Sequence, residues 1–568
     1  MDAGSDRSSE RNIVTTVDPV TLAVLQGRLE QIVDEMDATL FRSAFNPTIA
    51  EAHDACHGIY DARTGDTLVQ GTSGLPIFVG AMAFAVRLAI ARAERDGGPA
   101  DGDVYVFNDP YAGATHLNDV KLVRPLFRDG RLFCWLASVG HFNDVGGNVP
   151  GNYNPAARES HQEGVLLPPV KLVDAGVLRE DIVDIIRAIG RAPDNAYGDL
   201  RAQLSALGLG ARRLALLLDD YGDDVVAAAF GQLTDAAERQ TRACIAGLAD
   251  GTYACDDHLD NDGITDVPIR VAVTATVRGD RLALDFTGTD PACAGPLNIS
   301  RATATAACYV AIKHLFPEVP ANAGCLRPVD IAIPGGSLLD AVAPRPVGGY
   351  TETILRVMEI LFGAIAQAGP ERALGWSYGT INALSLAGHR DDGSRWVMFT
   401  FFGGGLGGSS SGDGLNHGSA PLSTAVIPPV EVFEATYPVR FTRWALREGS
   451  GGTGEHRGGL GATYELEVLG AEAEAFVFGE RARHAPRGTL GGGDGAPNVV
   501  TWTDADGPHH PALGAKATGI RLHRGDRLRI DSPGGGGYGD PARRAPEAAE
   551  RDRRLGYVAG DGTGPEAP

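Results

Sequence analysis

The chain has 568 residues and a formal net charge of −22, from 50 basic and 72 acidic residues. This length predicts about two to four domains and is ample for burying a large core. The acidic balance argues against a nucleic acid or an anionic membrane as the partner, so a metal ion, a protein subunit or a small molecule is favoured.

The cysteines and the apolar segments bear on where the protein works. Seven cysteines without any CxxC spacing indicate reduced thiols rather than a disulfide framework or a zinc ribbon. The first residues, MDAGSDRSSERNIVTT, lack the apolar run of a signal peptide. The best apolar segment, residues 77–91, is interrupted by Arg87 and is shorter than the roughly 18 residues of a membrane span. We therefore expect a soluble, cytoplasmic protein.

The first predicted element is a long helix that follows a polar, disordered tail over residues 1–16. Asp18 and Pro19 form a helix start, in which a capping carboxylate precedes a proline. A hairpin over residues 58–71 and a helix over residues 81–95 are predicted next. The long helix has about seven turns, because apolar residues recur at three- and four-residue steps, at Leu22, Leu25, Leu29, Ile32, Met36 and Leu40.

A second hairpin is predicted from residues 120–127 and 132–139, which are joined by an Asp129-Gly130 turn. Asp119 directly precedes the first strand and His141 follows the second. Pairing of the two strands therefore brings these residues to the same edge of the sheet. Six potential metal ligands lie in and around this hairpin, within loop-like sequence: Asp109, His116, Asp119, His141, Asp144 and His161. Such a density of carboxylates and imidazoles is what a divalent metal site needs.

A purely structural role is the alternative for each of these residues taken alone. Asp commonly stabilises a turn by accepting hydrogen bonds from nearby backbone amides, and Asp109 before Pro110 or Asp144 before Gly146 fits that role. The coincidence of three His and three Asp favours the metal site, because only 14 of the 568 residues are His.

The rest of the chain divides by the type of element it predicts. Residues 178–250 are almost wholly helical by periodicity, with breaks at 190–193 and 222–223, and a hairpin follows near residue 279. Helices over 300–316 and 352–369 flank a short strand. From Trp396 onward, short strands alternate with glycine-rich turns.

This order predicts an α+β protein with a multidomain mixed α/β body, a helical insertion and a mostly β, glycine-rich C-terminal part. The predicted units are a metal-site α+β domain, a helical insertion, an α/β domain, a β-rich C-terminal domain and a tail, over residues 17–177, 178–260, 261–395, 396–545 and 546–568.

The glycine clusters do not indicate a nucleotide site. Residues 449–454 match GxGxxG but lack the preceding parallel strand, the following helix and the later acidic residue of a dinucleotide fold. No GxxxxGK[ST] occurs, so the chain is not expected to hold ATP by a P-loop.

Several sequence blocks resemble the hydantoinase B/oxoprolinase family. They occur in the family's order from about residue 17 to residue 541. The most specific are HLNDV at residue 116, HFNDVGG at residue 141 and PGGGGYGD at residue 533. The resemblance implies the B-type component of an ATP-dependent hydantoinase or 5-oxoprolinase, which opens a cyclic amide. It also implies a hetero-oligomer with a hydantoinase A-type subunit that binds ATP and Mg.

The resemblance also implies a set of site residues. In the carboxylase branch of the family the metal is held by an Asp, a His-x-x-Asp pair and a later His. Matched to this chain, these ligands are Asp119, His141, Asp144 and His161, with Asp109 and His116 in supporting catalytic roles. For His116 two roles stay open, a further ligand or a hydrogen-bond donor beside the ligands. Phe142 and Phe78 stand where the family often has His. Asp54 and Glu352 lie in family blocks, and are interpreted here as a surface carboxylate and a helix-start residue.

The expected cofactor is a divalent transition metal, Mn, Zn or Fe, because imidazole and carboxylate ligands together suit these ions better than Ca or Mg. Two alternatives to the lactam hydrolase remain open. One is the corresponding component of an ATP-dependent ketone carboxylase, and the other is a non-catalytic scaffold for the ATP-binding partner.

Overall fold

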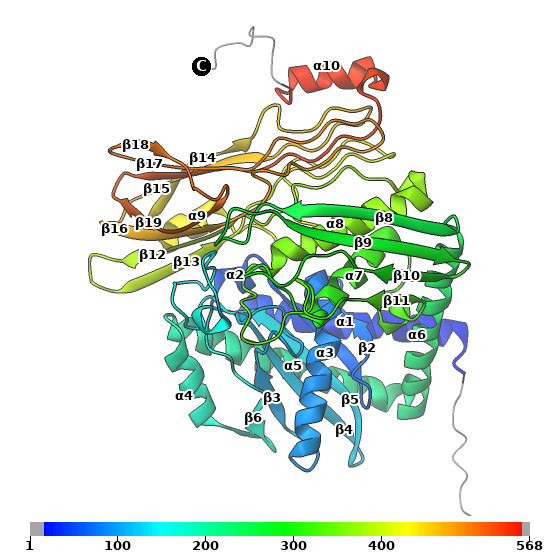
Figure 1. Cartoon of the computed structure of the whole chain (residues 1–568). Coiled ribbons are helices and arrows are strands. Elements are labelled where there is room, and N and C mark those ends of the chain that lie inside the picture. Colours follow the sequence, from blue (N-terminus) through cyan, green and yellow to red (C-terminus); the bar gives the residue numbers. More distant parts are fainter. Residues whose placement is uncertain (1–15, 559–568) are drawn as a thin grey trace, which may run out of the picture.

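The computed structural model describes residues 16–558 and has the α+β fold that the sequence predicts (Figure 1). The expected tail over residues 1–16 lies almost entirely outside the described residues. The long helix α1 (Pro19–Ser43) begins as predicted, because the Asp18 side chain accepts hydrogen bonds from the amides of Val20 and Thr21.

The first sheet contains seven strands in the order β2-β1-β5-β4-β3-β6-β7. Its central hairpin, β4 and β5, pairs antiparallel as predicted. The predicted hairpin over residues 58–71 is also present, as β1 and β2. The strands are β1 (Ala55–Asp61), β2 (Thr67–Gln70), β3 (Val104–Phe107), β4 (Asp119–Arg128), β5 (Arg131–His141), β6 (Val170–Asp174) and β7 (Val177–Leu178).

Helices cover both faces of this sheet. On one face, α1 and α5 share an apolar core with the strands, and α4 and the first half of α6 contribute to the same core. The helices of this layer, besides α1, are α2 (Pro47–Ala50), α4 (Glu180–Ile189), α5 (Pro193–Tyr221) and α6 (Asp223–Ala246). The second face is covered by α3 (Pro76–Arg95), which is the one described helix long and apolar enough to cross a membrane. Half of its most apolar stretch is buried inside the protein.

A second sheet completes a layered body. Helices α7 and α8 lie between α3 and this sheet, so that one large core runs from the first sheet to the second (Figure 1). The strand order is β11-β10-β9-β8. The elements are β8 (Gly251–Leu259), β9 (Ile269–Arg278), β10 (Arg281–Asp285), α7 (Arg301–Leu315), β11 (Val329–Ala332) and α8 (Tyr350–Ala368).

The C-terminal part is a two-layered β structure, as the sequence indicates. A four-stranded sheet, β13-β12-β16-β19, shares an apolar core with a five-stranded sheet, β14-β15-β20-β17-β18. The elements are β12 (Ala383–His389), β13 (Arg395–Thr400), α9 (Val430–Thr436), β14 (Val439–Leu446), β15 (Ala462–Val468), β16 (Glu472–Phe478), β17 (Val499–Asp504), β18 (Gly507–His509), β19 (Lys516–His523) and β20 (Arg527–Asp531). The segment predicted as a tail from residue 546 contains α10 (Pro546–Arg554).

Four glycine-rich segments run side by side between this β structure and α10 (Figure 1). We call them the glycine bundle: residues 403–408, 449–461, 488–495 and 533–539. They bind one another through backbone hydrogen bonds, such as Gly535 N to Gly459 O at 2.9 Å and Gly459 N to Leu406 O at 2.7 Å. A Cβ atom at Gly535 would lie 2.0 Å from the carbonyl oxygen of Leu406, so only glycine allows this approach.

Buried ion pairs join the C-terminal part to the layered body. Arg481, which follows β16, donates to Asp257 on β8 at 2.8 Å and to Glu359 on α8. Arg356 on α8 lies 3.4 Å from the same Asp257 carboxylate. These side chains are fully or almost fully buried, so each charge depends on its partners for compensation.

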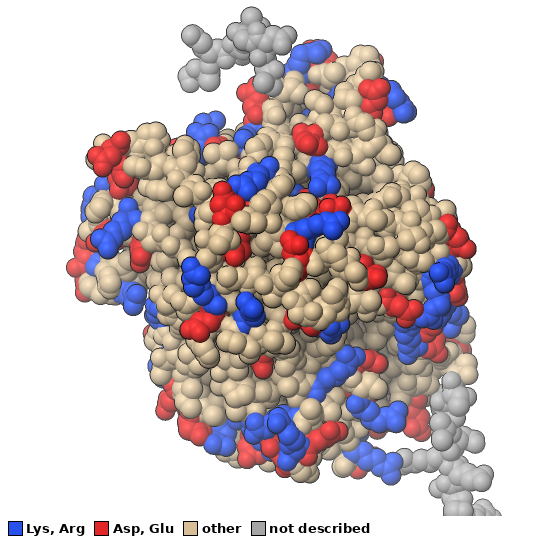
Figure 2. Space-filling view, viewed as in Figure 1, with Lys and Arg blue, Asp and Glu red and all other residues tan. Residues whose placement is uncertain are grey.

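The surface charges are mixed in sign on the face drawn in Figure 2, where acidic and basic side chains are interspersed. Many charged side chains of the described residues form exposed ion pairs, such as Arg281 with Asp330 at 2.9 Å.

We expect Gly535→Ala to destabilise the protein by about 3 kcal/mol, because the added methyl group must push apart two backbone segments. Thermal unfolding followed by circular dichroism should show a lower midpoint. Gly231→Ala is the matched control, because Gly231 lies in α6 with open space around its Cβ position. That change should be neutral or stabilise the helix by up to about 1 kcal/mol. Equal midpoints for the two variants would refute the packing argument.

Candidate metal centre

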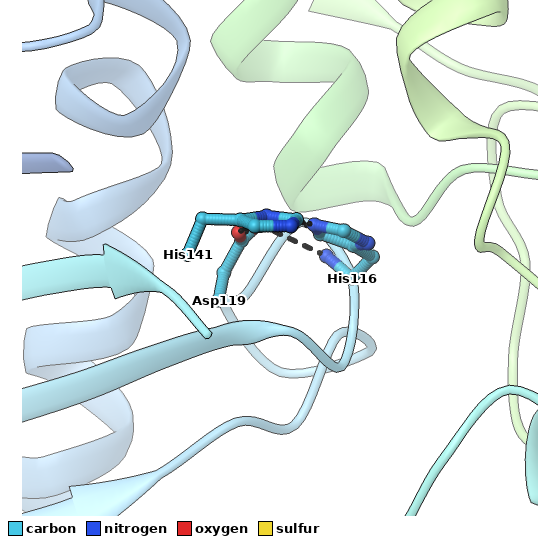
Figure 3. A group of neighbouring side chains, drawn as sticks. All are labelled: His116, Asp119 and His141. Carbon is cyan, nitrogen blue, oxygen red and sulfur yellow. Dashed lines mark hydrogen bonds and ion pairs between the residues drawn. The ribbon is translucent and has the colours of Figure 1, made fainter. Parts of the chain in front are cut away.

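Three potential metal ligands meet where the central hairpin opens (Figure 3). Asp119 begins β4 and His141 ends β5, and the two residues are directly opposed in the strand register. His116 lies in the loop that precedes β4. All three side chains are buried. The predicted hairpin thus brings Asp119 and His141 together, as expected. His116, three positions before Asp119, joins them.

The ligand atoms have the mutual spacing that one bound ion requires. Asp119 Oδ1 lies 3.0 Å from His116 Nε2 and 3.3 Å from His141 Nδ1, and the two ring nitrogens are 3.1 Å apart. Ligands about 2.1 Å from a single transition metal are roughly 3.0 to 3.4 Å from one another in octahedral or tetrahedral geometry. The trio therefore forms a possible metal-binding group.

The loop that carries His116 is held by hydrogen bonds to the neighbouring strand. Asn118 donates from its side chain to the carbonyl of Phe142 at 2.8 Å, and its own carbonyl accepts from the amide of Phe142 at 2.8 Å. The Thr115 hydroxyl donates to the second oxygen of Asp119. These bonds leave Asp119 Oδ1 as the oxygen that faces the imidazoles.

The electrostatics of the trio favour a charged carboxylate. Burial acts to raise the pKa of Asp119, but His116, His141 and Lys121 together hold that pKa well below its ordinary value. Burial lowers the pKa of Lys121 to about 8, against the opposing effect of Asp119. The Lys121 ammonium donates to the backbone carbonyl of Asp119 at 3.1 Å.

Asp54 is a fourth group at this centre. It precedes β1, and its Oδ2 lies 4.0 Å from His141 Nδ1. Its other oxygen is buried and has no hydrogen-bond partner among the described residues. Burial raises the pKa of Asp54 to about 7, an effect that His141 opposes and Asp119 reinforces. An unpartnered carboxylate oxygen on a side chain beside an imidazole and a second carboxylate fits a cation site and is costly without one.

The other residues named from the sequence are not part of this three-residue group. Asp144 is buried, but its oxygens accept hydrogen bonds from Arg191 and from the amides of Gly146 and Gly151. His161 is exposed in a short 3-10 helix, Ser160–Gln162. Asp109 accepts from the amide of Tyr111 at 2.9 Å, in a turn after β3.

Sequence reasoning missed the position of Asp54, and its interpretation as a surface carboxylate was wrong, since only 9% of the residue is exposed. The available signal was its place just before the apolar strand ACHGIYD. That strand pairs with β5, which brings Asp54 to the same sheet edge as His141. Glu352 does lie in the first turn of α8 as expected, although it is fully buried.

Aromatic rings surround the imidazoles. The ring of Tyr350 lies 4.7 Å from that of His116, and the ring of Phe399 lies 5.1 Å from that of His141. Tyr153 contacts both imidazoles and stacks on Phe399 at 4.7 Å. The wall of the centre thus combines the first sheet, the start of α8 and β13, three parts far apart in the sequence.

A buried trio with the spacing of metal ligands, at the end of a hairpin and enclosed by aromatic rings from distant segments, is typical of an enzyme centre rather than a surface ion site. Comparison with known families is consistent with this. The chain matches the hydantoinase B/oxoprolinase family over residues 18–541 and belongs to that family.

Individual relatives cover nearly the whole chain. It is 33% identical to the beta subunit of the caprolactamase of Pseudomonas jessenii, over 97% of this chain and 95% of that protein. It is 29% identical to the B subunit of a putative D-/L-hydantoinase from a Pseudomonas strain, over 95% of this chain and 93% of that protein. It is also 30% identical to 5-oxoprolinase 1 of Arabidopsis thaliana, where it matches 42% of the longer protein.

Solved structures agree with the fold. The crystal structure of the ATP-dependent caprolactamase from Pseudomonas jessenii superposes with a TM-score of 0.88 at 32% identity, covering 96% of this chain and 95% of that chain. A nucleotide-free acetone carboxylase superposes with a TM-score of 0.84 over 95% of this chain and 78% of that chain. The identity to this second structure is 21%, so it establishes likeness of fold alone.

We predict that the purified protein carries close to one transition-metal ion per chain and that His116→Ala or His141→Ala removes it. The reason is that each change deletes one of three mutually spaced ligand atoms. Elemental analysis by mass spectrometry measures the content, and Asp54→Ala should lower the metal affinity by about 10- to 100-fold.

His161→Ala and Asp144→Asn are the discriminating controls, because they test the ligand set inferred from the family resemblance. Full metal content in both controls supports the trio. Loss of metal in His161→Ala, with retention in His116→Ala, would instead favour the set Asp119, His141, Asp144 and His161.

Proposed function

We propose that this chain is the metal-bearing B-type component of an ATP-dependent enzyme that hydrolyses a cyclic amide. The observation that carries the proposal is the buried trio with its ligand-like spacing, in a chain of the hydantoinase B/oxoprolinase family. In this proposal His116, Asp119 and His141 hold Mn, Zn or Fe, and Asp54 completes the ligand set. Asp144 shapes its loop through Arg191, and His161, which is exposed in its short 3-10 helix, is not a ligand.

A divalent ion at this centre would polarise a carbonyl group and make a coordinated water more acidic. The chain's own residues supply the surroundings. Asp119 contributes the compensating charge, while the Thr115 hydroxyl and the Asn118 side chain fix the direction in which that carboxylate and the His116 loop face. Tyr153, Tyr350 and Phe399 exclude bulk water from the imidazoles, which strengthens electrostatic interactions at the site.

The proposal includes a partner subunit that binds ATP and Mg. Two relatives that match almost the whole chain are named as the beta or B subunit of their enzymes, and one solved relative is described as ATP-dependent. The sequence contains no P-loop motif of its own. A hydantoinase A-type subunit would therefore activate the amide oxygen with ATP before water is added at the metal centre, in a hetero-oligomer within the cytoplasm.

Reconstitution with a hydantoinase A-type subunit tests this function. We expect ATP hydrolysis that is stimulated by a lactam and coupled to release of the ring-opened amino acid, and no activity from either protein alone. His141→Ala should reduce the coupled rate by at least about 100-fold, because removal of a metal ligand disables the centre. Arg281→Ala is the matched control, because it removes only an exposed ion pair between β10 and β11 of the second sheet.

The same assay separates the competing functions. Stimulation by a ketone with bicarbonate, and not by any lactam, would identify a carboxylase and refute the hydrolase. Undiminished turnover by the His141→Ala complex would show that the chain is a non-catalytic scaffold.

A further inference from the structure

A small cavity adjoins the metal centre on its aromatic side. Its volume is about 40 Å³, and its floor includes Asp54, Tyr153 and Tyr350, which surround the trio. Phe401, Ser419 and Ser423 line its more exposed end. The remaining lining residues are mostly apolar or aromatic: Leu75, Thr351, Tyr378, Ile381, Phe399, Ala420, Leu422 and Ala425.

Two polar side chains in this lining have an atom without a hydrogen-bond partner among the described residues, Asp54 and Thr351. Thr351 lies in the first turn of α8, only 4% of it is exposed, and its hydroxyl makes no hydrogen bond among the described residues. A buried hydroxyl without a partner costs roughly 1 to 3 kcal/mol, so it is expected to serve a ligand or an ordered water. Thr351 neighbours Tyr350, whose ring contacts His116.

The charge of the lining limits what the cavity can hold. Among the lining residues that the structure describes, none is Lys or Arg, and the one charged group is the carboxylate of Asp54. The carboxylates of Asp54 and Asp119 would already balance the charge of a divalent ion at the trio. A substrate carboxylate placed against these rings would therefore lose its hydration without gaining an uncompensated cation or a basic side chain as partner. An uncharged ring avoids this desolvation cost.

We propose that this cavity receives the ring of an uncharged cyclic amide and that the Thr351 hydroxyl donates a hydrogen bond to it. The proposal rests on the function proposed above and narrows its substrate class, since a lactam that bears a carboxylate, such as 5-oxoproline, is disfavoured. A cavity of about 40 Å³ is smaller than a lactam ring, so the proposal requires side chains at the outer end, such as the partly exposed Phe401, to shift when the ring binds.

Steady-state kinetics of the reconstituted complex with ATP tests this inference. The substrates are 2-pyrrolidone and 5-oxoproline, which share the same five-membered lactam ring and differ only in the carboxylate. We expect kcat/KM to be at least about 100-fold higher for 2-pyrrolidone. Thr351→Val should raise KM for 2-pyrrolidone about tenfold and change kcat little, as expected for one lost hydrogen bond. Thr351→Ser, which restores a hydroxyl, should recover most of the affinity.

Two further variants test whether the kinetic effects arise from this cavity. Thr305→Val removes a hydroxyl from α7 that bonds only to the carbonyl of Arg301, and should leave both kinetic constants unchanged. Phe401→Arg places a cation at the outer end, and should shift the preference toward 5-oxoproline by at least about tenfold.

The possible results distinguish failure of this substrate inference from failure of the proposed hydrolase function. Lactam hydrolysis with a preference for 5-oxoproline, or an unchanged KM in Thr351→Val, overturns the inference and leaves the hydrolase standing. A complex that opens neither ring contradicts the hydrolase and the inference together. Metal content and the thermal midpoint of each variant establish that the Thr351 changes do not act through unfolding.

Discussion

The candidate centre depends on the register of one hairpin. Asp119 and His141 are opposed because β4 and β5 pair through the Asp129-Gly130 turn, where both residues adopt positive φ, 48° and 74°. Such a turn matches the natural twist of the strands and fixes their pairing. A slip by one residue would turn one of the two side chains to the opposite face of the sheet and separate them. The His116 loop and Asp54 can contribute to a metal site only when β4 and β5 are paired in this register.

The other wall of the centre is held by charges rather than by strand pairing. Helix α8 presents Tyr350 and Thr351 to the site, and the buried ion pairs of Arg356 and Arg481 fix that helix against β8 and the C-terminal part. Glu163 adds a second restraint, because it accepts hydrogen bonds from the amides of Val347 and Gly348 just before α8. Burial raises the pKa of Glu163 to about 8. Buried ions of this kind often give little net stability, but they penalise any arrangement in which a charge loses its partner.

Local features could be predicted from the sequence because they depend on neighbouring residues, as with the Asp-Gly turn that defines β4 and β5. The family resemblance anticipated the fold and placed the chemistry around HLNDV and HFNDV, where the trio lies. The finer assignment of site residues needed contacts that no local pattern contains. Asp144 was expected to be a ligand, yet its oxygens bind Arg191, which lies 47 positions away. Asp54 joins the site through the pairing of β1 with β5, and His116 lies as close to Asp119 as a ligand would. The predicted domain boundaries and ligand set remain predictions.

The glycine bundle has a consequence for how the chain matures during synthesis. Its four segments are separated by tens of residues, and Gly535 in the last one hydrogen bonds to Gly459 while Gly452 and Gly408 bond to residues 535 and 536. These hydrogen bonds need the last segment, so the glycine bundle cannot form until residues 533–539 have left the ribosome. The first sheet needs nothing beyond β7 for its own pairing, and can form while the rest is still being translated. Phe399 of β13, which packs beside His141, therefore reaches its final position late. In a nascent chain the imidazoles come together before the aromatic rings enclose them.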